Sequence, residues 1–119
     1  RRRQIAAAYS QQLGDTGLLL PVCRQGAQHV FHQYVVQSSV RDSLRAWLGS
    51  HGVGTAIHYG RPVHEQPAYA GRLGAAVPLP LTEQAARQVL SLPMYPGLTD
   101  QQVGRVAKLI RTWSQERGI

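Results

Sequence analysis

Apolar residues recur at helical spacing at the start of the chain. Ile5, Tyr9 and Leu13 are four residues apart, so they share one face of a helix over residues 2–13. Gly14 then stands at the C′ position, where a glycine commonly closes a helix. The pattern predicts a first helix that packs through this face.

A second helical pattern follows Ser39. We predict Ser39 to be the N-cap residue, with Asp42 at N3 as an acidic variant of the capping box. Gly52 ends the pattern. The apolar stripe of this helix comprises Val40, Leu44, Trp47, Leu48 and His51.

The last helix has the clearest start. Thr99 is the predicted N-cap and Gln102 lies at N3, which completes a capping box. Leu98 at N′ and Val103 at N4 are placed to form a hydrophobic staple. The apolar face predicted for this helix comprises Val103, Val106, Ala107, Ile110 and Trp113.

Between these helices the pattern predicts strands and one more helix. Residues 29–37 alternate and are rich in β-branched and aromatic side chains, and residues 53–59 form a second short run of this kind. A third helix is predicted from Thr82, with Glu83 in its first turn, where the helix dipole favours an acid. The stretch SLPMYP then predicts a brief strand that ends at Pro93. We therefore expect a single α+β domain over residues 1–119, an α/β sandwich with three or so strands and helices packed on them.

The bulk composition limits the class of protein. The chain has 119 residues and 43% hydrophobic content, which suits one packed core, and it contains no apolar run of membrane-spanning length. Its single cysteine, Cys23, cannot form an internal disulfide, so we expect a reducing compartment, the cytoplasm. The net charge of +7 raises a nucleic-acid-binding hypothesis that rests on charge alone.

The segment HYGRPVHEQPAYAG, residues 58–71, concentrates the candidate chemistry. Tyr59 and His64 carry groups that donate or accept protons, and Arg61 can grip a phosphate or carboxylate through two parallel hydrogen bonds. One interpretation is a loop that binds an anion and a sugar. The other is a loop that packs Tyr69 and exposes the rest, and the residues by themselves leave both open.

Metal binding and nucleophilic catalysis have less support. His29 and His32 would point to opposite faces of a strand, and His58 with His64 lacks a second pair of ligands, so we expect no metal. Cys23 has Arg24 beside it but no defined base, and no serine-hydrolase or phosphate-loop motif occurs.

The order of five motifs resembles the DegT/DnrJ family of sugar aminotransferases. These motifs are H-x-x-H-x-Y-V, R-D-x-L, H-Y-x-x-P-x-H-x-Q-x-A-Y, L-P-L-T-E and V-L-S-L-P-M-Y-P, and the likeness covers nearly the whole chain. The family commonly has proline after His-Tyr, where this chain has Gly60. The resemblance implies the C-terminal small domain of the aspartate-aminotransferase fold, fold type I.

The resemblance also implies a function. Enzymes of this family use pyridoxal phosphate to pass an amino group, usually from glutamate, to a keto sugar on a nucleotide diphosphate. It makes Tyr59 and His64 the main substrate contacts, followed by His58 and Arg61, through hydrogen bonds to the sugar or its diphosphate. It further implies an N-terminal large domain as partner, and a homodimer formed through that domain.

The lysine content tests what the chain can do by itself. Its one lysine, Lys108, lies in the last predicted helix, away from any glycine-rich or serine-rich loop or acid that would serve a cofactor. We therefore expect no cofactor on this chain alone and no transamination by it. The alternative is a stand-alone binding or regulatory module of the same fold that associates with an intact aminotransferase subunit. A small domain separated from its large partner should display an exposed apolar face.

Overall fold

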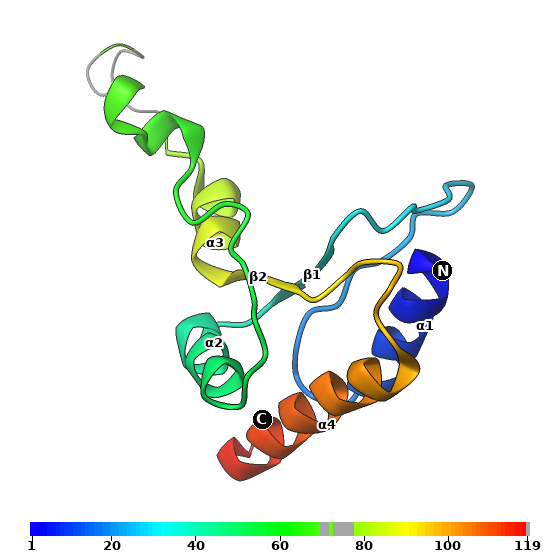
Figure 1. The fold of residues 1–119 in the computed structure, drawn as a ribbon. Helices are drawn as coiled ribbons and strands as arrows, with labels where there is room; N and C mark the ends of the chain where they lie inside the picture. The colour runs from blue at the N-terminus through cyan, green and yellow to red at the C-terminus, as the bar shows by residue number, and fades with distance from the viewer. Residues whose placement is uncertain (70–71, 73–77, 119) are drawn as a thin grey trace.

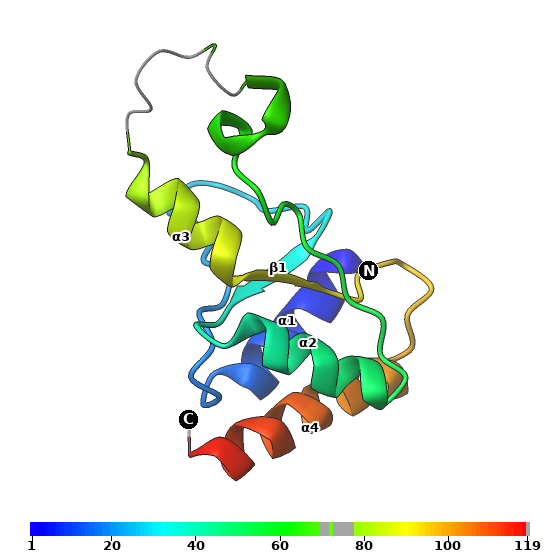
Figure 2. The same cartoon turned by 90° about the vertical axis from the view of Figure 1, so that its left-hand side faces the viewer.

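A computed structural model describes residues 1–69, 72 and 78–118 of the chain. In chain order the elements are α1 (Arg2–Leu13), β1 (Tyr34–Gln37), α2 (Arg41–Ser50), the 3-10 turns η1 (Val63–Glu65) and η2 (Pro67–Tyr69), α3 (Pro80–Gln88), β2 (Val89–Leu92) and α4 (Asp100–Arg117). Helices α1, α2 and α4 lie on one side of a short antiparallel sheet, and α1 packs along α4 (Figures 1 and 2).

The sheet of the described residues has two regular strands. β1 and β2 pair antiparallel, with Tyr34 opposite Leu92. Isolated bridges flank this pair, from Leu19 to Gln37 and from Ala56 to Ser91. The structure thus has two strands where the sequence predicted three or so, and the strand predicted over 53–59 is reduced to the bridge at Ala56.

The strand predicted over 29–37 is also shorter, because its partner cannot continue the ladder. The register places Gln33 opposite Pro93, which has no N–H to donate. Beyond that point the guanidinium of Arg2 binds the carbonyls of His32 and Met94, at 2.8 and 3.0 Å. Residues 29–33 therefore lie outside the strand, and the argument that His29 and His32 face opposite sides of it does not apply.

The end of the first helix and the start of the second differ from the prediction. α1 spans the predicted residues, but Gly14 is right-handed with φ −61°, and the positive φ falls on Gly17. α2 begins at Arg41 with Val40 as its N-cap, so the prediction of Ser39 was wrong. The hydroxyl of Ser38 accepts the N–H of Val40 at 3.2 Å, which gives that amide its partner before the helix starts.

The third helix begins earlier than predicted and leads directly into β2. α3 starts at Pro80, whose fixed φ suits the first turn of a helix, rather than at Thr82. It ends at Gln88, and β2 begins at the next residue, Val89. No loop separates helix from strand, so the position of β2 determines where α3 leaves the body of the protein.

The predicted start of α4 is confirmed. The hydroxyl of Thr99 accepts the N–H of Gln102 at 3.2 Å, and the side chain of Gln102 accepts the N–H of Thr99 at 2.9 Å. The predicted apolar face is buried, and Leu98 belongs to the same core cluster as Val103.

The core joins α1, α2, α4 and both strands around large side chains. Trp113, Tyr9 and Tyr34 are buried, and the rings of the two tyrosines lie 5.1 Å apart. The hydroxyl of Tyr9 donates to the carbonyl of Pro93 at 3.1 Å, and that of Tyr34 pairs with Ser10 at 2.9 Å. Burial raises the pKa of both phenols, so these hydroxyls keep their protons.

Two 3-10 turns and α3 extend away from this core (Figure 1). The radius of gyration is 15.9 Å, compared with about 13.5 Å for a compact domain of this length. The larger radius of gyration agrees with η1, η2 and α3 extending from the core with little of their surface packed against it. No helix of the described residues has the length and apolar character needed to cross a membrane.

We expect Thr99→Ala to lower the free energy of unfolding by about 1 kcal/mol, because it removes the acceptor for the N–H of Gln102. Urea denaturation followed by far-ultraviolet circular dichroism measures the change. Thr99→Ser keeps a hydroxyl and serves as the control. Equal stability of the alanine variant and the unmodified chain would contradict the capping role.

Candidate functional site

The segment from His58 to Tyr69, which we call the lip, holds the residues that the sequence singled out. Pro62, with φ −60° and ψ 153°, is the N-cap of η1, and its carbonyl accepts the N–H of Glu65 at 3.1 Å. The side-chain amide of Gln66 donates to the carbonyl of Arg61 at 3.1 Å. Local hydrogen bonds and prolines thus fold the lip into short turns.

His58 lies against the sheet. Its Nδ1 is 2.9 Å from Oγ of Ser91, a buried residue of β2. Ser91 is held in turn by backbone hydrogen bonds to Ala56 in both directions, at 2.8 and 3.2 Å. His58 and Ser91 line a hollow of about 340 Å³, together with the polar residues His32, Gln33 and Thr55.

His64 lies against α3 instead. Its Nε2 is 3.4 Å from Oε1 of Glu83, and the same oxygen accepts the N–H of Leu79 at 3.0 Å. The hydrogen bond from Leu79 is the main cause that holds the pKa of Glu83 below its ordinary value, and His64 lowers it further. A carboxylate therefore stands beside this imidazole at neutral pH.

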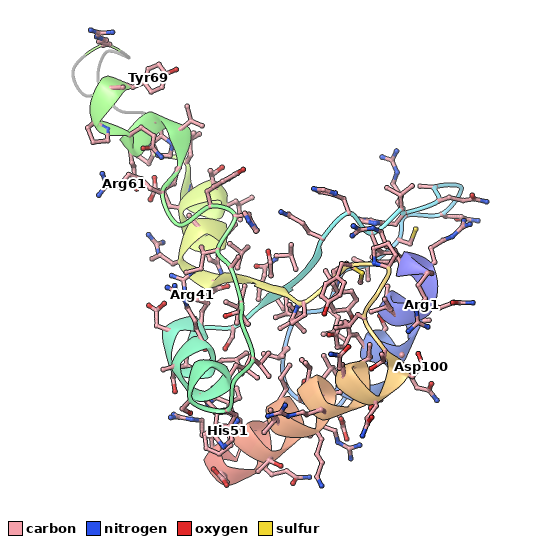
Figure 3. The ribbon with its side chains drawn as sticks, in the orientation of Figure 1. Arg1, Arg41, His51, Arg61, Tyr69 and Asp100 are labelled. Atoms are coloured by element: carbon pink, nitrogen blue, oxygen red, sulfur yellow. The ribbon has the colours of Figure 1, made fainter. Side chains whose placement is uncertain are left out.

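Tyr59 and Arg61 face solvent. Tyr59 is 76% exposed, and its ring meets that of His58 edge-on, with the centroids 5.5 Å apart. Arg61 is exposed on the outer side of the lip (Figure 3), and the described part of the chain offers its guanidinium no partner. Both side chains are free to meet a ligand from outside.

Within the part of the chain that the structure describes, the four predicted residues do not converge on one pocket. His58 belongs to the hollow beside the sheet, whereas His64 belongs to the junction with α3. A second hollow, of about 320 Å³ between the Gly52–Gly54 turn and the start of α4, contains none of the four. The lip thus has one face toward the sheet and one toward α3.

Sequence reasoning missed the two residues that hold these histidines. Ser91 was assigned only to a brief strand, and Glu83 only to a favourable position in the helix dipole. Glu83 lies inside the motif L-P-L-T-E, four residues after Leu79, and this spacing is the signal that could have identified its bond to the Leu79 amide.

One group of potential metal ligands occurs among the described residues. His64, Glu65 and Glu83 bring one ligand atom each within 4.8 Å of one another. Glu83 already accepts two hydrogen bonds there, and exposed acidic groups gather commonly without an ion. The expectation of no metal stays a prediction.

Lys108 does not fit the cofactor that the resemblance implies. It is exposed on α4 and lines a shallow hollow with Gln12, Arg111, Thr112 and Gln115. None of these described neighbours is an acid that could pair with a pyridine nitrogen. Among the described residues, the surroundings of Lys108 therefore do not fit pyridoxal phosphate, and the expectation that the chain alone binds no cofactor stays a prediction.

The lip and α3 also carry exposed apolar side chains. Leu81 is 81% exposed and Val63 is 67% exposed, which is unusual for such residues in a packed domain. The exposed apolar residues of this region are Tyr59, Val63, Tyr69, Leu79 and Leu81.

Comparison with known proteins gives one family. The model of the DegT/DnrJ/EryC1/StrS aminotransferase family matches residues 1–111. UDP-N-acetyl-3-dehydro-alpha-D-glucosamine 3-aminotransferase of Acidithiobacillus ferrooxidans is 39% identical over 110 residues, which are 92% of this chain and 29% of that relative. The dTDP-3-amino-3,4,6-trideoxy-alpha-D-glucose transaminase of Streptomyces venezuelae is 42% identical over 116 residues, 97% of this chain and 31% of that relative.

A solved structure agrees with these relatives. The crystal structure of S. venezuelae DesV in complex with a ketimine intermediate matches with a TM-score of 0.91 and 42% identity, covering 97% of this chain and 31% of that one. The chain thus spans 29% to 31% of the length of these similar proteins.

The lowered pKa of Glu83 has a testable consequence. The ionised carboxylate and its bond to Leu79 should persist below pH 4.5, the ordinary value, and be lost as the pH falls through the lower pKa of the folded state. In an NMR titration, the Glu83 carboxyl carbon and the Leu79 amide should share this midpoint.

Glu83→Gln is the control for that titration, since it cannot ionise and should abolish the Leu79 response. A Glu83 midpoint at or above 4.5 would contradict the net lowering of this pKa by the hydrogen bonds from Leu79 and His64.

Proposed function

Because the chain belongs to the DegT/DnrJ/EryC1/StrS aminotransferase family, we propose that it is the C-terminal small domain of a fold type I, pyridoxal-phosphate-dependent aminotransferase. The parent enzyme aminates a keto sugar carried on a nucleotide diphosphate and takes the amino group from glutamate. The observation that carries this proposal is the match over nearly the whole chain to less than a third of an S. venezuelae transaminase.

In this proposal the chain contributes binding rather than the reacting amine. Pyridoxal phosphate supplies the electron sink of amino transfer, and the large N-terminal domain holds it with a lysine that this chain lacks. The surroundings of Lys108, which do not fit this cofactor, support the assignment of the cofactor lysine to the large domain. The large domain also forms the homodimer, and the exposed apolar side chains of the lip and α3 are available to pack against such a partner.

The lip covers the mouth of the active site and hydrogen-bonds the substrate. Arg61, whose guanidinium has no partner among the described residues, suits a diphosphate, because its planar fork matches two phosphate oxygens. Tyr59 and His64 bind sugar hydroxyls, and His58 supports Tyr59 from the sheet side. Proton abstraction is left to the lysine of the large domain.

The first test uses the purified 119-residue chain and pyridoxal phosphate. We expect no stable absorbance band at about 420 nm, the region typical of this cofactor bound to a lysine. Lys108→Ala controls for weak reaction with a surface amine. A stable band that Lys108→Ala abolishes would contradict the proposal that the large domain supplies the cofactor lysine. Transamination by the chain alone would contradict it as well.

The second test uses the full-length parent enzyme. We expect His64→Ala to lower kcat/KM for the sugar nucleotide about three- to tenfold, the worth of one hydrogen bond, with the cofactor spectrum unchanged. His51→Ala is a matched control, because His51 packs on Trp47 with ring centroids 4.1 Å apart, far from the lip (Figure 3). Unchanged kinetics for His64→Ala would favour a lip that only packs.

A further inference from the structure

We propose that Glu83 is a positioning residue, which orients the imidazole of His64 so that the lip presents one defined ring nitrogen to the sugar nucleotide. The inference rests on the proposed function, because that function assigns His64 to the substrate. With Nε2–H donated to the carboxylate, Nδ1 is the nitrogen left to accept a hydrogen bond from a sugar hydroxyl.

The distance of 3.4 Å between Nε2 and Oε1 is long for a hydrogen bond, so the orientation depends on how firmly each partner is held. Glu83 is held by a backbone hydrogen bond at the start of its own helix and by partial burial. Its Oε1 accepts the N–H of Leu79, the N-cap residue of α3, at 3.0 Å, and its side chain is only 24% exposed. The carboxylate also stands in the first turns of α3, where the helix dipole favours a negative charge.

Helix α3 is itself fixed to the body of the protein. The guanidinium of Arg41, on α2, is almost fully buried and donates to the carbonyls of Ala86 and Val89 at 3.3 and 3.0 Å. Figure 3 shows Arg41 between α2 and α3. A continuous set of contacts therefore runs from α2 through α3 and Glu83 to His64.

Glu65 provides a matched control. It lies next to His64 in the chain, carries the same charge and comes within 4.8 Å of the same group of atoms, but it is exposed. If negative charge near the imidazole were all that mattered, Glu65 and Glu83 would act alike. If the imidazole needs an acceptor in a fixed position, only the loss of Glu83 will change its orientation.

The first experiment measures the hydrogen bond in the 119-residue chain by ¹H–¹⁵N NMR of the histidine side chains. We expect a protected Nε2 proton on His64 that disappears in Glu83→Ala and survives in Glu83→Gln, whose amide oxygen still accepts, and in Glu65→Gln. Adding a chelator should leave this signal unchanged. No protected proton in the unmodified chain, or its loss in Glu65→Gln or on chelation, would overturn the inference.

The second experiment measures sugar-nucleotide kinetics in the full-length parent enzyme. We expect Glu83→Ala to raise KM about three- to tenfold with little change in kcat, and Glu83→Gln to recover most of this loss. In a His64→Ala background, Glu83→Ala should cost nothing more, because the two residues act as one unit. Additive losses in the double variant would overturn the positioning role.

The two experiments separate the two proposals. If the NMR signal behaves as expected but His64→Ala leaves KM unchanged, the assignment of His64 to the substrate fails, and with it the positioning role, whereas the hydrogen bond stands. If the NMR signal is absent while His64→Ala still raises KM, the proposed function stands and the role of Glu83 fails.

Discussion

The pairing of β1 with β2 is the constraint on which the rest of this structure depends. β2 is joined to α3 without a loop, so its register against β1 also determines where α3 leaves the core. The same four-residue strand presents Ser91 to Ala56 and to His58, which places the start of the lip. Leu90 and Leu92, on either side of Ser91, are buried in the core. The alternation of β2 therefore connects the hydrophobic core to the candidate site.

The helices could be predicted well wherever local chemistry determines them. The capping box at Thr99 and Gln102 involves residues three apart, so the sequence contains all of the information. The strands could not be predicted as well, because their lengths depend on partners elsewhere in the chain. Residues 29–33 have strand-like composition, but two distant residues end the strand. Pro93, about 60 residues later, has no N–H to donate to Gln33. Arg2, about 30 residues earlier, donates to the carbonyl of His32.

In the candidate site, too, local sequence patterns were predictable and contacts between distant residues were not. Composition and motif order predicted His58, Tyr59, Arg61 and His64 as substrate contacts, all within a stretch of seven residues. Their supports lie far away in sequence, since Ser91 is 33 residues from His58 and Glu83 is 19 residues from His64. Neither pairing follows from a local pattern. Each requires that α3 and β2 turn back along the lip, which is a property of the tertiary fold.

The outer edge of β2 leaves no backbone group available for another strand. The N–H and carbonyl of Ser91 are bound to Ala56, the N–H of Val89 donates to Ala85, and the carbonyl of Val89 accepts from Arg41. Open sheet edges are the usual templates for aggregation and for domain swapping. The bridge to Ala56 and the buried Arg41 thus leave a further strand no backbone group on this side of β2 itself to pair with.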